Sequence, residues 1–330
     1  MRKENGANLK MTPAVGGAAY FFLIACYLVL SLAGQGILNA AGVTDGVLFY
    51  AVSFFLPVIA AAAVIVATVM KKGAELNGGL NAAAWKRAIG ITPSAPAYFL
   101  AAILAGVGMI AGFGFVNQLV ADAMTGAGLN AAETNLPLDG FGKFALFTVF
   151  SALFPAAAEE CFFRGLLLNS LTGGKKGDLK TDALAVFISA LCFAVYHGSL
   201  AQTAYQFIYG ALLAFLTLKA GGILPAFTAH FLNNLAVLII SYARLNVDLT
   251  NGITIAVGLL LAAASIALIF LCGKYKSRAV KYAGKRTESD GTDEEQTEKS
   301  DSKIVSFFFP FGAAGIAVCA ILIICSAVAV

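Results

Sequence analysis

Charged residues are scarce in this sequence. Asp, Glu, Lys and Arg together make up 12% of its 330 residues, about half the share found in a typical soluble domain. Hydrophobic residues make up 59%, and they fall in runs that reach the roughly 20 residues needed to cross a hydrocarbon layer of about 30 Å. This composition excludes an ordinary soluble globular fold and predicts an all-α, polytopic helical membrane protein.

Cysteine and histidine are also few. The six cysteines all lie inside apolar segments and none forms a Cys-x-x-Cys pair, which argues against a disulfide framework or a thiolate metal site. The basic residues behind the net charge of +4 lie mainly in the gaps between apolar segments, where they indicate membrane topology and not nucleic-acid binding. The first apolar run is longer than the roughly 7–15 residues of a signal-peptide core, so we expect a retained transmembrane helix.

Basic residues are concentrated in the N-terminal arm and in every second gap between apolar segments. By the positive-inside rule this alternation places the N-terminus in the cytoplasm, and nine spans then leave the C-terminus outside. We expect a multi-pass protein of the plasma membrane. The nine expected spans are about 14–38, 47–70, 96–121, 141–170, 182–198, 202–219, 223–242, 252–272 and 304–330.

The composition divides the chain into three parts. Residues 1–272 form a membrane-embedded domain of eight helices, with the motifs described below inside 141–242. Residues 273–303 begin basic, turn acidic and offer no apolar face to bury, which predicts a disordered cytoplasmic linker. Residues 304–330 form a ninth, accessory transmembrane helix.

Three charged residues interrupt the fourth apolar segment: Glu159, Glu160 and Arg164. A charge in the hydrocarbon region costs at least a few kcal/mol, so these residues need a reason to be there. Arg164 follows Glu160 by four residues, and at that spacing the two side chains can neutralise each other on one helix face. Glu159 has Phe163 at the same spacing and no charged partner. Glu159 is therefore the candidate general base.

Both histidines of the chain lie in apolar segments. His197 ends the run Phe193-Ala-Val-Tyr-His, and Asn234 follows His230 by four residues, on the same helix face. At 1.5 Å of rise per residue, Glu159, His197, His230 and Asn234 lie roughly 10 to 22 Å from the cytoplasmic ends of their helices. Their depths overlap, which predicts one shared site.

Such a set of groups suits amide hydrolysis without a covalent intermediate. A glutamate held away from bulk water accepts a proton from a bound water, and a histidine beside it holds that water or binds a metal. A second histidine and an asparagine amide donate hydrogen bonds to the oxyanion of a tetrahedral intermediate. Pro155 and Pro225 precede these residues, and helix kinks there would open a cavity; the alternative is that a membrane helix simply tolerates them.

The three motifs, in this order on successive segments, resemble the CPBP family, which comprises the Ras-converting type of CAAX prenyl proteases and bacterial bacteriocin-processing (Abi) relatives. The resemblance is close over about 140–240, and the last span departs from the family's eight-helix pattern. The motifs are Glu159-Glu160-x-x-x-Arg164, Phe193-x-x-x-His197 and His230-x-x-x-Asn234.

This resemblance implies an intramembrane endopeptidase whose site opens to the cytoplasmic side. By the resemblance, Glu159 activates the water with His197, and His230 acts with Asn234 on the oxyanion. The supporting residues would be Glu160, Arg164 and Phe193. The implied partners are a peptide or protein substrate at the membrane and the lipid bilayer, with no nucleic acid.

Cofactor use and function class remain open at this level. Glu159, His197 and His230 make a His₂Glu set that can bind Zn, although the His-Glu-x-x-His helix of the zincins is absent. Cys161, next to the two glutamates, is a candidate nucleophile of a cysteine protease, but buried cysteine is commonly inert. Buried acids and histidines also mark proton relays, so a proton-coupled transporter is an alternative, as is a non-catalytic bacteriocin-immunity membrane protein.

Overall fold

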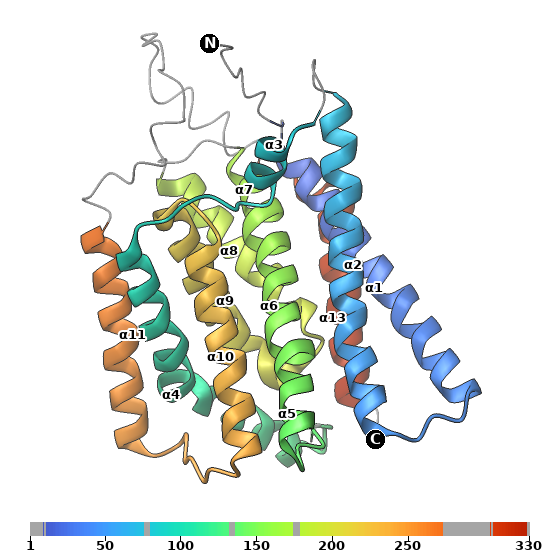
Figure 1. The fold of residues 1–330 in the computed structure, drawn as a ribbon, viewed down its shortest axis with the longest axis vertical. Coiled ribbons are helices and arrows are strands. Elements are labelled where there is room, and N and C mark those ends of the chain that lie inside the picture. Colours follow the sequence, from blue (N-terminus) through green and yellow to red (C-terminus); the bar gives the residue numbers. More distant parts are fainter. Residues whose placement is uncertain are drawn as a thin grey trace.

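Helices make up the regular structure of the part of the chain that the computed structural model describes, which is residues 9, 11–75, 80–131, 136–173, 179–272, 304 and 306–328 (Figure 1). The elements are α1 (Pro13–Ala40), α2 (Gly46–Ala74), α3 (Ala82–Ala88), α4 (Pro96–Gly126), α5 (Phe141–Phe147), η1 (Thr148–Leu153), α6 (Phe154–Glu159), η2 (Glu160–Leu167), α7 (Leu168–Thr172), α8 (Leu179–Tyr196), α9 (Leu200–Ala220), α10 (Leu224–Tyr242), α11 (Gly252–Cys272), η4 (Phe308–Gly312) and α13 (Ala313–Val328). The elements labelled η are π-helical.

Eight helical segments in the described residues are long and apolar enough to cross a membrane. The protein is therefore a multi-pass helical membrane protein, as its composition predicted. The elements α5 to α7 form one of these spans, Phe141–Thr172. The predicted span 202–219 is present as α9 but is not among the eight, because Gln202 and Gln206 lower its hydropathy. The predicted linker 273–303 lies outside the described residues.

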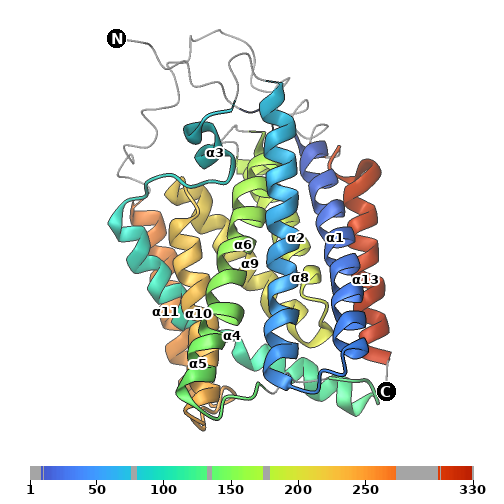
Figure 2. The same ribbon diagram turned by 45° about the vertical axis from the view of Figure 1, so that its right-hand side comes forward.

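The central helices are enclosed by two flanking groups. On one side α4 packs against α11, and on the other α1 packs against α2 and α13. Between them lie the span α5–α7 and helices α8, α9 and α10 (Figures 1 and 2). Helix α9, the least apolar of the long helices, contacts α8, α4 and α10. The least apolar of the long helices is thus packed against three others.

Hydrogen bonds between two loops place two of the basic regions at the same end of the bundle. Ile223 N–H donates to the Gly90 carbonyl at 3.0 Å, and the Thr92 hydroxyl bonds the Gly221 carbonyl. The segment after α3 therefore meets the end of α9 (Figure 1). The basic residues of these two regions lie at one end of the bundle, as the topology requires. That this end faces the cytoplasm stays a prediction.

The C-terminal helix α13 is attached directly to the bundle. The Tyr20 hydroxyl on α1 donates to the Cys192 carbonyl of α8 at 3.2 Å and lies 3.5 Å from Cys319 Sγ on α13. The Ser326 hydroxyl donates to the Gly198 carbonyl at 3.2 Å. The accessory helix thus packs next to α8 and the turn that follows it.

Pro155 and Pro225 occupy different positions in their helices. Pro225 is in the first turn of α10, where its missing N–H is not needed, so the prediction of a kink inside that helix is wrong. Pro155 lies in the middle of the span Phe141–Thr172, directly after the π-helical η1. The Phe154 N–H donates there to the Val149 carbonyl, five residues back. The backbone is therefore irregular at Pro155, close to the charged residues.

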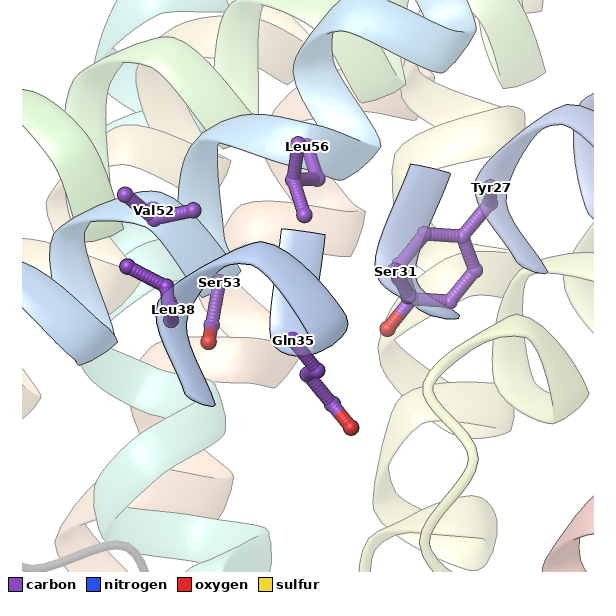
Figure 3. A pocket seen from close by; sticks show the side chains of 7 residues that line it. All are labelled: Tyr27, Ser31, Gln35, Leu38, Val52, Ser53 and Leu56. Carbon is purple, nitrogen blue, oxygen red and sulfur yellow. The ribbon is translucent and has the colours of Figure 1, made fainter. Parts of the chain in front are cut away.

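A small pocket lies between α1 and α2 (Figure 3). Its volume is about 40 Å³, which is room for a few water molecules. Ser31, Gln35 and Ser53 give it polar walls, and the Tyr27 ring forms part of its lining. The same Tyr27 ring packs against Tyr196 at the end of α8, with 5.9 Å between ring centroids.

Glycines let α4 and α11 approach each other closely. A Cβ on Gly258 would overlap the backbone of Gly112, and a Cβ on Gly108 would lie 2.7 Å from the Ala262 nitrogen. These contacts involve main-chain atoms, which cannot rotate away. The two helices are therefore held together by a backbone-to-backbone contact that has no room for a side chain.

We expect Gly258→Ala to lower the melting temperature of the detergent-solubilised protein by several degrees, because overpacking costs about 1–3 kcal/mol. Gly252→Ala, at the start of the same helix, is the control, since nothing lies within 4 Å of its added Cβ. Thermal unfolding of both variants measures the difference. Equal melting temperatures would contradict the close approach.

Candidate active site

The charged residues of the fourth span lie where its backbone is irregular. Helix α6 ends at Glu159, and the π-helical η2 begins at Glu160. A π-helical turn contains an extra residue and changes the direction of the side chains that follow, and such turns occur frequently at functional sites. Glu159 is 9% exposed, and Glu160 and Arg164 are fully buried. The span thus directs all three charges into the protein.

Glu160 and Arg164 form the predicted ion pair. Arg164 Nη1 lies 2.7 Å from Glu160 Oε1, and both side chains are fully buried. Arg164 Nη2 donates to the Gly210 carbonyl on α9 at 3.2 Å. The guanidinium carbon lies 4.1 Å from the centroid of the Phe193 ring, a cation–π contact. The arginine therefore ties its own span to α9 and α8.

His230 of α10 is held by the same glutamate. Its Nδ1 lies 2.8 Å from Glu160 Oε1. Because Glu160 is paired with Arg164 it is ionised and accepts this bond, so Nδ1 carries the proton. The sequence predicted Glu160 only as the partner of Arg164. The structure adds that Glu160 orients His230 and leaves its Nε2 as the free ring nitrogen.

His197 is oriented by the backbone of its own helix. Its Nδ1 lies 2.8 Å from the Phe193 carbonyl, an acceptor, so Nδ1 again carries the proton. The ring packs on Phe193, with 4.7 Å between centroids. Helix α8 ends at Tyr196, and Gly198 has φ +66, a left-handed conformation that favours glycine. His197 therefore lies at a sharp turn with Nε2 free.

Both free nitrogens face one oxygen of Glu159. Glu159 Oε2 lies 4.0 Å from His197 Nε2 and 3.8 Å from His230 Nε2. Among the described residues this buried oxygen has no hydrogen-bond partner. With both histidines in the tautomers above, all three atoms offer lone pairs and none offers a proton to the others. Such a set binds a species that brings positive charge or protons, such as water.

The predicted zinc ligands Glu159, His197 and His230 lie farther apart here than the ligands of a zinc ion do. No group of three or more His, Cys, Asp or Glu side chains among the described residues is arranged to hold a metal ion. Zinc–nitrogen bonds of about 2.0–2.1 Å place tetrahedral ligand atoms about 3.3 Å apart, and the separations of 4.0 and 3.8 Å are wider. The residues as placed do not fit zinc, and the zinc set stays a prediction.

Asn234 is the predicted site residue that the structure does not link to the others. It is half-buried on α10, one turn after His230, and no hydrogen bond joins its side chain to another described residue. Its neighbour Asn233 instead accepts a hydrogen bond of 2.6 Å from the Tyr205 hydroxyl. Asn234 therefore has an amide that is free to bind a ligand.

We expect substitution of the paired Glu160 to lower the stability of the protein much more than substitution of the unpaired Glu159. Glu160→Gln leaves the buried Arg164 without its counter-charge, and breaking a buried pair costs about 3–5 kcal/mol. We expect a large fall in melting temperature for Glu160→Gln. We expect little change for Glu159→Gln, because its Oε2 has no partner to lose. Thermal unfolding in detergent compares the two, and a similar fall in both would contradict this division.

Comparison with known proteins points to one family. Residues 141–236 match the family described as "Rce1-like: Type II CAAX prenyl endopeptidase Rce1-like". No curated protein and no solved structure matches the chain. The matched segment runs from α5 into α10 and contains every predicted site residue. The match confirms the resemblance drawn from the three motifs over residues 141–236, the part of the chain that this family model covers.

Proposed function

We propose that this protein is an intramembrane endopeptidase that hydrolyses a peptide bond of a membrane-associated or prenylated-type substrate. The observation that carries the proposal is the convergence of Glu159 Oε2 with the Nε2 atoms of His197 and His230. These atoms come from α6, from the turn after α8 and from α10, all within the segment that matches the endopeptidase family. Among the described residues, Glu159 Oε2 is buried without a hydrogen-bond partner.

Glu159 and His197 activate the water in this proposal. A water between them donates one hydrogen to Glu159 Oε2 and the other to His197 Nε2. As its oxygen attacks the substrate carbonyl carbon, one proton passes to Glu159, which acts as general base. Glu159 then returns that proton to the leaving nitrogen, the C–N bond breaks, and a carboxylic acid and an amine are released.

His230 and Asn234 support the oxyanion. Glu160 holds His230 through Nδ1 at 2.8 Å, so Nε2 donates to an oxyanion only when the ring carries both protons. The Asn234 amide supplies a second donor from the same face of α10. The proposed oxyanion site thus consists of one charge-assisted donor and one neutral donor.

The proposed setting is the plasma membrane, with the N-terminus in the cytoplasm and the site open to that side. The bilayer and a peptide or protein at the membrane are the proposed partners. A prenylated CAAX protein, a peptide pheromone and a bacteriocin leader are all substrates of the required chemistry, since each presents a peptide bond at the membrane surface.

We expect Glu159→Gln to reduce cleavage at least 100-fold, because the amide cannot accept the proton from water. His197→Ala should cause a similar loss. Proteoliposomes with a fluorogenic farnesylated peptide ending in a CAAX sequence provide the assay. Membrane peptides that accumulate in cells carrying Glu159→Gln extend the measurement to other substrates.

Glu75→Gln is the matched control for this assay, since Glu75 forms an exposed pair with Lys72 at 2.7 Å, far along the chain from the site. Wild-type cleavage by Glu159→Gln would overturn the peptidase proposal. Uptake driven by a pH gradient and abolished by Glu159→Gln, without any cleavage, would favour the transporter, and neither activity would favour the non-catalytic immunity protein.

Metal dependence is a separate prediction. Because the site atoms lie wider apart than zinc ligands, we expect cleavage to persist after dialysis against a chelator. Elemental analysis of the purified protein accompanies the assay. Stoichiometric zinc that is lost in His230→Ala, together with chelator-sensitive cleavage, would contradict the water-only mechanism and establish Glu159, His197 and His230 as ligands.

A further inference from the structure

Tyr196 places a buried hydroxyl group beside the candidate site without a visible partner. The residue is 8% exposed, and its hydroxyl has no hydrogen-bond partner among the described residues. Leaving a buried polar group unpaired costs about 1–3 kcal/mol. A buried phenol hydroxyl of this kind needs an explanation, and a ligand of the site is one.

Packing fixes the Tyr196 ring on the Glu159 side of the site. The ring contacts Phe163, one helical turn after Glu159, with 5.3 Å between centroids. It also contacts Tyr27 at 5.9 Å and His197 at 6.0 Å. The phenol lies within electrostatic range of the Glu159 carboxylate. Aromatic rings on three sides therefore hold Tyr196 in place.

The proposed water can accept one more hydrogen bond, and the hydroxyl group of Tyr196 can donate it. Glu159 Oε2 and His197 Nε2 are the two acceptors of the proposed water. The water gives one hydrogen to each of these atoms, and its oxygen keeps two lone pairs. One lone pair must point at the substrate carbonyl for attack. The other is free to accept a hydrogen bond, and the phenol O–H is a donor.

We propose that Tyr196 is a further catalytic residue, whose hydroxyl donates a hydrogen bond to the attacking water and directs its remaining lone pair toward the substrate carbonyl. Tyr196 keeps its proton throughout; the proton of the water goes to Glu159. This inference rests on the proposed peptidase function and adds a residue at a variable position of the motif Phe193-x-x-x-His197.

The test is Tyr196→Phe, which removes the hydroxyl and keeps the ring that packs on Phe163. We expect kcat to fall about tenfold, the value of one well-placed hydrogen bond, while KM for the farnesylated fluorogenic peptide stays within about twofold and the melting temperature is unchanged. Incorporation of 3-fluorotyrosine at position 196 keeps both ring and donor, and we expect it to retain most of the activity.

Tyr20→Phe is the matched control. Tyr20 is also a buried phenol that contacts α8, but its hydroxyl bonds the Cys192 carbonyl. We expect that variant to keep its kcat. A kcat of Tyr196→Phe equal to wild type, with Glu159→Gln inactive, would overturn the role of Tyr196 and leave the proposed function intact. Cleavage that survives Glu159→Gln would overturn the proposed function itself.

Discussion

One carboxylate oxygen organises the centre of this protein. Glu160 Oε1 lies 2.7 Å from Arg164 Nη1 and 2.8 Å from His230 Nδ1, so it joins the fourth span to α10. Arg164 continues the connection to the Gly210 carbonyl of α9. In a low-dielectric interior an unpaired charge is far more costly than in water. Every helix that contacts this pair is therefore constrained in position by the need to keep the charges compensated.

Glu159 differs from its neighbour because it lacks such compensation. Glu160 is fully buried and bonded on one oxygen to two donors, whereas Glu159 is slightly exposed and its Oε2 faces two ring nitrogens that offer no proton. The two adjacent carboxylates thus differ in their surroundings: Glu160 joins helices through its bonds, and Glu159 has an oxygen without a partner among the described residues.

The sequence predicted the helical membrane fold and the Glu160–Arg164 pair because both follow from local patterns, namely apolar runs and a four-residue spacing. It did not predict the π-helical turns around Glu159, because no residue spacing in the sequence indicates them. It also missed the bond between Glu160 and His230, which lie 70 residues apart. The Gly210 carbonyl offers no side-chain signal at all. Contacts between helices therefore could not be predicted from residue spacing alone.

The position of His230 shows why adjacent carboxylates suit this site. Successive residues on a helix point in directions about 100° apart, so Glu159 and Glu160 cannot both face one small group head-on. An imidazole solves this because its two nitrogens lie on different edges of the ring: Nδ1 bonds Glu160 while Nε2 faces Glu159. His230 therefore contacts both the buried ion pair and the unpaired oxygen of Glu159. A single ring thus joins the contacts that hold the helices together to the candidate site.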